Sequence, residues 1–225
     1  MSDIIFLYET SGLAAAPFVE RGFSVYCYDI LNINEEKYGA QCFYWDAFSG
    51  FEEIVSRHDG KAVLVFGFPP CTDLAVSGAK HFYKKSQANP NFQKEAMSLV
   101  YKVPEVGKTL GCTWAFENPV SVISTKFRKF DYKFEPFEYG GYLPEDDIHP
   151  EFPQYIEPRD AYPKPTCLWT SSDFIMPPKI PVRYAYGWSK QTTKLGGKSA
   201  RTKYIRSLSP RGFFTALAMQ MAGEI

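Results

Sequence analysis

Several features common in other protein classes are missing from this 225-residue sequence. No stretch is long and apolar enough to span a membrane, and no apolar signal segment is present. The five cysteines include no CxxC pair, which, together with the missing signal segment, favours a reducing compartment. We therefore expect a cytoplasmic protein (in a bacterium or a phage-infected host cell), with no membrane partner and no metal site.

Acidic residues are absent from residues 174 to 223, although the whole chain is neutral, with 25 basic and 25 acidic residues. A solvated helix face usually mixes both signs, so a block of one sign indicates a partner, and polyanionic nucleic acid is the simplest one. A flexible basic tail is the alternative. Aromatic residues and Ile205 are interleaved with the basic ones, which favours a folded segment.

The first 46 residues lack the GxGxxG pattern of a dinucleotide site but resemble a βαβ unit in layout. We predict strands at 3–8 and 23–28, a helix at 13–21 and a further strand end at 42–46. This layout places the charged end of a cofactor near the helix start and its ribose hydroxyls on Asp29. Asp46 is suited either to an adenine amino group or to capping the next turn. An ordinary βαβ turn, without a ligand, fits this segment equally well.

The most informative stretch is Pro69-Pro70-Cys71, which follows the apolar run 62–66. That run is typical of a buried parallel strand, and Gly67 with the two prolines ends it. Cys71 is therefore predicted on a stiffened loop at the carboxyl end of a strand, where open α/β sheets bind ligands. A small buried hydrophobe is the other interpretation of a cysteine. It does not explain the two prolines or the Thr-Asp pair that follows.

A second apolar strand, 112–116, also ends in polar residues and a proline, Glu117-Asn118-Pro119. Adjacent strand ends bring Glu117 and Cys71 towards one pocket. A carboxyl group in such an apolar site has a raised pKa and can be held protonated as a donor. The alternative is a surface carboxylate with satisfied hydrogen bonds.

The other elements are predicted more coarsely. We expect helices at 51–58, with His58 on the surface at its end, and at 92–110, interrupted near Pro104. We also expect an irregular region at 131–160, a strand within 162–170 and a last helix at 211–222. The basic, aromatic segment 77–85 has the composition of a mobile loop that closes on a phosphate backbone. A surface loop without a partner is equally compatible with it.

Together these motifs resemble those of the DNA cytosine-5 methyltransferases, especially the short bacteriophage forms. Pro69-Pro70-Cys71 matches the catalytic loop of that family, Glu117-Asn118-Pro119 corresponds to its Glu-Asn-Val, and residues 206–213 are similar to its closing segment. Two motifs depart from the family. Its Phe-x-Gly-x-Gly-Gly is replaced by residues 8–12, and its Gln-x-Arg-x-Arg is missing, with Lys164 and Thr166 as the nearest equivalents.

The resemblance implies an α/β fold, namely a Rossmann-like methyltransferase sheet with helices on both faces and a very small target-recognition appendage. It divides the chain into a catalytic domain (1–173), a basic recognition segment (174–203) and a closing segment (204–225). It implies S-adenosylmethionine as cofactor, S-adenosylhomocysteine as product, duplex DNA with a flipped target cytosine as partner, and methyl transfer to cytosine C5. A monomer is the favoured state.

The resemblance assigns roles to catalytic and cofactor-binding residues, and the two basic segments indicate the DNA-binding ones. The expected catalytic residues are Cys71, Glu117, Asn118, Lys164 and Thr166. The expected cofactor-binding residues are Tyr8, Thr10, Ser11, Gly12, Asp29, Ile30, Asp46, Phe68, Pro69 and Ser207. The expected DNA-binding residues are Ser77, Lys80, Lys84, Lys85, Lys190, Lys194, Lys198 and Arg201.

Other functions remain open at this point. One alternative is a related enzyme that places another one-carbon group on a pyrimidine C5 or acts on free nucleotides, although the basic block argues against free nucleotides. A catalytically silent nucleic-acid-binding module on the same fold is disfavoured by Cys71 and Glu117. A thiol enzyme with a Cys-His pair lacks a well-placed histidine.

Overall fold

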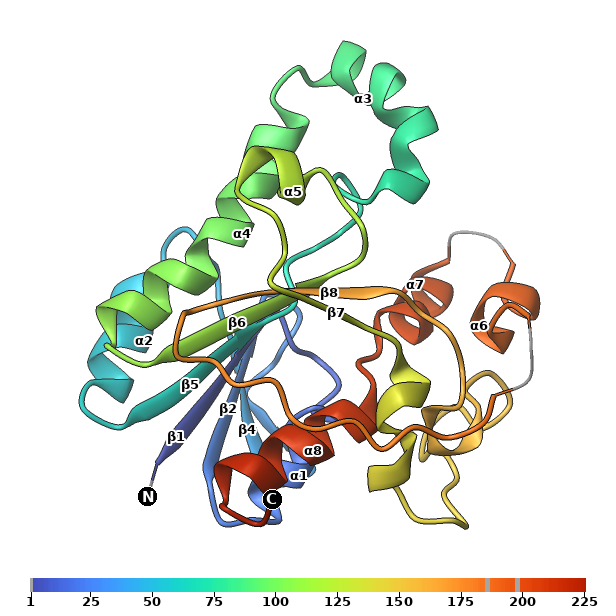
Figure 1. Cartoon of the computed structure of the whole chain (residues 1–225). Helices are drawn as coiled ribbons and strands as arrows, with labels where there is room; N and C mark the ends of the chain where they lie inside the picture. The colour runs from blue at the N-terminus through green and yellow to red at the C-terminus, as the bar shows by residue number, and fades with distance from the viewer. Residues whose placement is uncertain (1, 185–186, 197–198) are drawn as a thin grey trace.

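The protein is built on one eight-stranded sheet in the order β3-β4-β2-β1-β5-β6-β8-β7 (Figure 1). The computed structural model describes residues 2–184, 187–196 and 199–225. The strands are β1 (Asp3–Leu7), β2 (Ser24–Asp29), β3 (Glu35–Lys37), β4 (Ala40–Tyr44), β5 (Ala62–Gly67), β6 (Thr113–Asn118), β7 (Tyr132–Phe134) and β8 (Thr166–Thr170). The predicted α/β sheet with helices on both faces is confirmed. The edge strands β3 and β7 were not predicted, because three-residue strands carry too little periodicity.

The centre of the sheet is parallel and its margins are antiparallel. Strands β4, β2, β1, β5 and β6 pair in parallel, whereas β8 runs antiparallel to β6 and β7 antiparallel to β8. The order of the parallel strands reverses between β1 and β5, which are neighbours although β2 to β4 come between them in sequence. Ligands of open α/β sheets bind beyond the carboxyl ends of the strands at such a reversal.

The α-helices are α1 (Ala16–Val19), α2 (Phe51–His58), α3 (Phe82–Ala88), α4 (Phe92–Thr109), α5 (Ile123–Lys126), α6 (Lys190–Thr193), α7 (Ala200–Ser207) and α8 (Arg211–Met221). Three 3-10 segments are η1 (Val76–His81), η2 (Pro136–Tyr142) and η3 (Pro158–Asp160). In Figure 1, α2 and α4 cover one face of the sheet, and α1 and α8 cover the other. None of the described helices is long and apolar enough to cross a bilayer.

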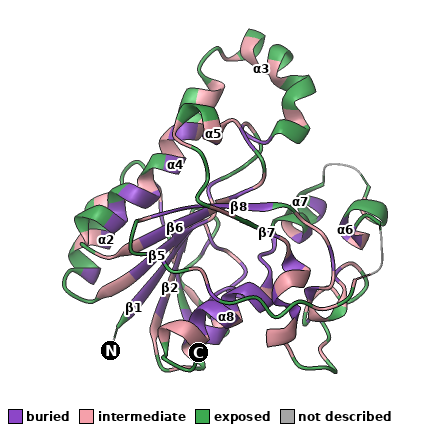
Figure 2. Ribbon diagram, viewed as in Figure 1, coloured by how far each residue is buried: buried purple, intermediate pink, exposed green. Residues whose placement is uncertain are grey.

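Two apolar cores lie on the two faces, because successive strand residues point to opposite sides. Ile4 and Phe6 of β1 belong to the core that includes Phe213 and Phe214 of α8. Ile5 and Leu7 of the same strand belong to the core that includes Met97, Val100, Val103 and Val106 of α4. In Figure 2 the central strands are correspondingly buried, whereas α3 is mostly exposed.

Three local predictions were wrong. His58 is fully buried rather than on the surface, because its Nδ1 pairs with Asp3 Oδ2 at 2.8 Å and its Nε2 hydrogen-bonds to Tyr28 Oη at 2.7 Å. Helix α4 runs through Pro104 without a break, since the burial of its apolar face compensates for the missing backbone donor. Helix α1 covers only part of the predicted 13–21.

Segment 77–85, expected to be a mobile loop, is helical. It forms η1 and α3, and the rings of Phe82 and Phe92 pack with their centroids 5.7 Å apart. Lys85 Nζ also contacts Asp73 Oδ1 at 2.5 Å, which ties α3 to the segment after Cys71. These contacts join residues that are ten or more positions apart, so they leave no local pattern in the sequence. The loop was predicted from composition alone.

The first part of the predicted recognition segment (174–203) is hydrogen-bonded to the predicted catalytic domain. Its first residues hydrogen-bond to η2, through Gly141 N to Ile180 O at 2.8 Å and Val182 N to Phe137 O at 2.9 Å. Helix α7 crosses the predicted boundary between residues 203 and 204. The division into a catalytic domain, a recognition segment and a closing segment stays a prediction. The boundary between the last two falls inside α7.

Candidate active site

Cys71 lies on the loop that follows β5, and this loop is joined to the end of β6. The two strands pair in parallel with Gly67 opposite Phe116. Asn118 Nδ2 donates a hydrogen bond to Pro69 O at 2.8 Å. Further along, Val76 N donates to Val120 O, and Val122 N donates to Leu74 O, both at 3.0 Å. The segments that follow the two strands therefore form one connected structure.

Within this structure, Cys71 is exposed and Glu117 is half-buried. The Cys71 carbonyl accepts hydrogen bonds from Leu74 N at 3.0 Å and Ala75 N at 2.9 Å, which fixes the turn after the thiol. Asn118 is buried, and its Oδ1 accepts no hydrogen bond from the part of the chain that the structure describes. Its amide holds the loop, while one buried acceptor atom remains unsatisfied, a costly arrangement without a ligand.

Lys164 and Thr166 approach the same region from β8. Because β8 is antiparallel to β6, its first residues lie beside the end of β6, and Cys167 pairs with Asn118. Thr166 is buried and donates from Oγ1 to Lys164 O at 2.7 Å. Lys164 Nζ donates to Arg206 O at 2.9 Å and Leu208 O at 3.1 Å, so its ammonium group is hydrogen-bonded to the end of α7.

The electrostatics link Cys71, Glu117 and Lys164. Although the Cys71 residue is exposed at the surface, the protein atoms packed around its thiol desolvate it and so raise its pKa; the Glu117 carboxylate raises it further, while Lys164 lowers it. Burial also raises the pKa of Glu117, and Lys164 again opposes the shift. Desolvation thus favours the neutral form of both Cys71 and Glu117, and Lys164 favours the charged form of both.

A cavity of about 290 Å³ lies beyond the ends of β1, β2 and β4. It is lined by Tyr8, Asp29, Ile30, Trp45, Asp46, Ala47, Phe48, Pro70 and Leu99. Asp29 Oδ1 accepts from Leu31 N at 2.8 Å, and Asp46 Oδ1 accepts from Phe48 N at 2.9 Å. The second oxygen of each carboxylate accepts nothing from the described residues, and partial burial raises the pKa of Asp29.

A smaller cavity, of about 60 Å³, is lined by Tyr8, Glu9, Thr10, Ser11, Phe68, Tyr204, Ser207 and Leu208. Tyr8 lines both cavities. Its φ of 63° is a strained value for a bulky residue. Its backbone N donates to Tyr28 O at 2.7 Å and its hydroxyl donates to Leu99 O at 2.8 Å, which holds this conformation. Tyr8 therefore forms the boundary between the two spaces.

The structure thus brings most of the predicted cofactor residues to two adjoining cavities. Gly12 and Pro69 line neither. Gly12 has a φ of 74°, and a Cβ there would lie 2.8 Å from Lys37 Cβ, so glycine is required for the turn. Pro69 is buried and acts through its carbonyl, which accepts from Asn118.

The predicted DNA-binding residues fall into two surface groups. Ser77, Lys80 and Lys84 are exposed on η1 and α3, at the upper right of Figure 1. Lys190 lies in α6, Lys194 follows the end of α6, and Arg201 lies in α7. In Figure 1, α6 and α7 lie on the right, below α3. Lys194 and Arg201 are exposed and Lys190 is half-buried. Lys85 is paired with Asp73, and Lys198 lies outside the described residues.

Several lining residues were missed by the sequence interpretation. Trp45 and Phe48 flank Asp46, so aromatic residues next to a strand-end acid were the available signal. Leu99 comes from the middle of α4 and Tyr204 from α7, and only the tertiary fold brings them here. Glu9 had no distinguishing pattern, although it accepts three hydrogen bonds in the turn after β1.

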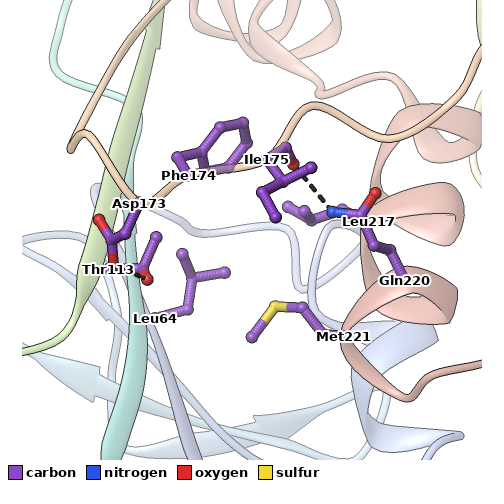
Figure 3. A pocket seen from close by; sticks show the side chains of 8 residues that line it. All are labelled: Leu64, Thr113, Asp173, Phe174, Ile175, Leu217, Gln220 and Met221. Carbon is purple, nitrogen blue, oxygen red and sulfur yellow. Dashed lines mark hydrogen bonds between the residues drawn. The ribbon is translucent and has the colours of Figure 1, made fainter.

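A different cavity, of about 230 Å³, lies between α8 and the strands β5 and β6 (Figure 3). It includes Thr113 at the amino end of β6, whereas Cys71 follows the carboxyl end of β5. Gln220 Nε2 donates to Ile175 O at 2.9 Å, as the dashed line shows, and Thr113 donates to Asp173 at 2.5 Å. These groups satisfy one another, so this cavity is not part of the candidate site.

Comparison with known proteins gives little information on function. No protein-family model matches the chain, and no curated protein matches it. One solved structure that it resembles is a prophage-encoded protein of E. coli with the provisional description of a DNA modification methyltransferase. The TM-score is 0.47 at 13% sequence identity, over 81% of this chain and 53% of that one, so this chain spans about half the length of that protein. Function must therefore be argued from the residues of this chain.

Proposed function

We propose that this protein is a DNA methyltransferase that transfers a methyl group from S-adenosylmethionine to C5 of cytosine through a covalent adduct with Cys71. The observation that carries the proposal is the connection between the two strand ends. Asn118 Nδ2 holds Pro69 O at 2.8 Å, and the Glu117 carboxylate is close enough to Cys71 to raise its pKa. A thiol and a carboxyl group at two strand ends that are connected in this way suit addition to a cytosine ring.

The two adjoining cavities support S-adenosylmethionine as the cofactor. The larger one has apolar and aromatic walls, from Ile30, Trp45 and Phe48, that suit a purine ring. The free oxygens of Asp29 and Asp46 suit ribose hydroxyls and an adenine amino group. Pro70 lines the larger cavity and is adjacent to Cys71, so a ligand there would lie near the thiol. When bound, S-adenosylmethionine supplies an electrophilic methyl group.

Each residue of the site has a role in this mechanism. Cys71 Sγ forms a bond to cytosine C6, while Glu117 donates a hydrogen bond or proton to N3, so that the ring accepts the added electron pair. C5 becomes nucleophilic and would take the methyl group, with S-adenosylhomocysteine as the leaving group. Loss of the C5 proton to water and cleavage of the Sγ–C6 bond would then restore the aromatic ring and the free thiolate.

The raised pKa values set a condition on this chemistry. A protonated Glu117 is the form that can donate to N3, and burial favours that form. The Cys71 thiol must instead lose its proton to attack. Lys164 is the cation that lowers the pKa of Cys71, and its ammonium group is bonded to the carbonyls of Arg206 and Leu208. We propose that Lys164 favours the thiolate from this position and that Asn118 and Thr166 support the loop and the base.

Substrate DNA enters the proposal through the exposed cations of α3, α6 and α7. Ser77, Lys80 and Lys84 on one segment, and Lys190, Lys194 and Arg201 on the other, would contact phosphates. A cytosine in a duplex cannot reach a cysteine at the edge of a sheet, so the target base must leave the stack. Residues 174–203 would form the small recognition segment.

Direct mapping of the product tests the proposal. The protein is incubated with S-adenosylmethionine labelled in its methyl group and with duplex DNA, and the modified bases are identified by mass spectrometry of the nucleosides. The expected product is 5-methylcytosine. Label on an exocyclic nitrogen, or no transfer to DNA in parallel with transfer to free nucleotides, would contradict the assignment.

A further inference from the structure

A cavity of about 470 Å³ lies beside α6, on the right of Figure 1, and is not part of the candidate active site. Its walls come from two segments, residues 157–163 and residues 183–190. The volume is within the range of small-ligand cavities, about 300–1,000 Å³. Pro163 is one of the lining residues, and the residue that follows it is Lys164, the cation that acts on Cys71. A ligand in this cavity would therefore be bound next to the segment that carries Lys164.

Aromatic rings form one part of the wall. Trp188 lines the cavity and is 80% exposed, although tryptophan side chains are mostly well buried in folded proteins. It makes no hydrogen bond or ring contact with the residues that the structure describes. Tyr184 lines the same cavity, and its ring packs on that of Phe137 with the centroids 4.3 Å apart. An exposed indole beside a supported ring is the kind of surface on which nucleobases stack.

Two cations lie at the same cavity. Arg183 is exposed and Lys190 is half-buried, and both line it. Within the described ranges, neither side chain pairs with a carboxylate. Cations without a partner in the protein are suited to the phosphates on either side of a stacked base. The cavity thus combines the two features of sites for single-stranded nucleic acid, namely stacking rings and phosphate-binding cations.

One carboxylate also belongs to the wall. Glu157 Oε1 accepts a hydrogen bond from Lys190 N at 3.1 Å, and Oε2 is buried and accepts nothing from the described residues. An ionised carboxylate has about four acceptor positions, and a buried oxygen without a donor is costly. The missing donor is of the kind that adenine, cytosine and guanine carry as an exocyclic amine and that thymine lacks. A phosphate, in contrast, would be repelled by Glu157.

We infer that this cavity binds one unstacked nucleobase that carries an exocyclic amine, with Trp188 as the stacking surface and Glu157 as the hydrogen-bond acceptor. That the base belongs to a DNA strand, as a neighbour of the target cytosine, rests on the function proposed above. Among the described residues, this cavity shares none of its lining with the two cavities at Tyr8, so it is separate from the proposed cofactor site. A base held here would make the protein favour some sequences around its target over others.

Binding of short single strands to the full chain tests this. Each labelled strand consists of thymidine except for one central base, which is either adenine or unsubstituted purine, the same ring system without the amino group. Affinities are measured by fluorescence anisotropy in the absence of S-adenosylmethionine, so neither cytosine nor methyl transfer is involved. A hydrogen bond to a charged group corresponds to about a tenfold or larger change in affinity. We expect the wild type to bind the adenine strand more tightly than the purine strand by at least that factor.

Two substitutions assign the effect to its residues. In Glu157→Gln, the side-chain oxygen is needed for Lys190 N, so an amide NH2 group replaces Oε2, and the variant should bind both strands about equally. Trp188→Ala should weaken the binding of both strands by roughly five- to 150-fold through loss of stacking, and Trp188→Phe, which keeps a ring, should lose less. Glu52→Gln, at an exposed glutamate at the start of α2, is the matched control and should bind as the wild type does. Thermal unfolding shows whether each variant is folded.

The outcomes separate this inference from the proposed function. Equal binding of the two strands by the wild type overturns the selection of an amine, and unchanged affinity in Trp188→Ala overturns the stacking surface. If deoxyadenosine monophosphate binds as tightly as the adenine strand, the assignment of the base to DNA is overturned. None of these results changes the expected 5-methylcytosine product. A preference for the adenine strand without any methyl transfer to DNA would instead keep this site and reject the proposed function.

Discussion

The Cys71–Glu117 region and the basic region of α6 and α7 are constrained in very different ways. The first is joined by hydrogen bonds between segments nearly fifty residues apart, such as Asn118 Nδ2 to Pro69 O. In the second, Lys194 and Arg201 are exposed. The guanidinium carbon of Arg201 lies 5.9 Å from the centroid of the Tyr155 ring. The first region joins two strand ends around the candidate reactive groups. In the second, Arg206 joins α7 to Gln191 O and Leu195 O, and the groups left for a partner are exposed charges.

This difference separates two kinds of function. A reaction that forms a bond needs groups held to within a fraction of an ångström, which buried and hydrogen-bonded residues provide. Binding a phosphate backbone needs only cations that can approach it. We therefore expect changes in the Cys71–Glu117 region to abolish chemistry, and changes in the α6–α7 region to weaken binding in a graded, salt-dependent way.

The largest effect is expected at the nucleophile. Cys71→Ser should lower methyl transfer by roughly three orders of magnitude or more, because an alcohol without an adjacent base is a poor nucleophile. Transfer of labelled methyl groups to duplex DNA measures it. Cys112→Ser, at a thiol that precedes β6 at the opposite edge of the sheet, should keep full activity. Undiminished turnover by Cys71→Ser would rule out the covalent route.

Glu117→Gln should lower the transfer rate by about 100-fold or more, the usual contribution of a general acid. The glutamine amide retains a hydrogen bond to N3 but has no proton to give. The raised pKa of Glu117 predicts the pH dependence. The wild-type rate should fall as the pH rises through that raised value, because the carboxyl group then loses its proton. Glu117→Gln should lack this decline. A parallel decline in both proteins would assign the titration to another group.

Asp29→Ala should weaken S-adenosylmethionine binding by about 1.5–3 kcal/mol, roughly ten- to 150-fold, through loss of charged hydrogen bonds to ribose. Calorimetry measures this without DNA. Asp59→Ala removes an exposed carboxylate at the end of α2 and should bind the cofactor as the wild type does. Unchanged affinity in Asp29→Ala would show that Asp29 does not bind the ribose.

The smallest effect per residue is expected in the basic region. Each duplex phosphate contact contributes about 0.9 to the slope of log affinity against log salt, so replacing Lys190, Lys194 and Arg201 by Ala should reduce that slope by up to about 2.7. Fluorescence anisotropy on a labelled duplex measures it. Replacing Lys61, Lys108 and Lys129, which precede β5, β6 and β7 at the other edge of the sheet, should leave it unchanged. Identical slopes for the two triple variants would exclude this DNA surface.

The same contrast explains what the sequence could predict. Cys71 and Glu117 each follow an apolar run and have a proline within two residues, so a local pattern was sufficient to place both at strand ends. The parallel pairing of β5 and β6 then brings the ends together. The role of Lys85 in tying α3 to Asp73, and the approach of Leu99 and Tyr204 to the cavities, depend on contacts between distant segments. No local pattern records such contacts, and composition alone mistook η1 and α3 for a loop.

Covalent trapping tests the central claim most directly. Duplex DNA in which 5-fluorocytosine replaces cytosine is incubated with the protein and S-adenosylmethionine, and the products are separated under denaturing conditions and analysed by mass spectrometry. Fluorine cannot leave C5 as a proton does, so the Sγ–C6 bond should persist. The account predicts a stable protein–DNA adduct on the peptide that contains Cys71, and none with Cys71→Ser. An adduct on another residue, or methyl transfer to ordinary duplex DNA without any trapping on the fluorinated one, would contradict it.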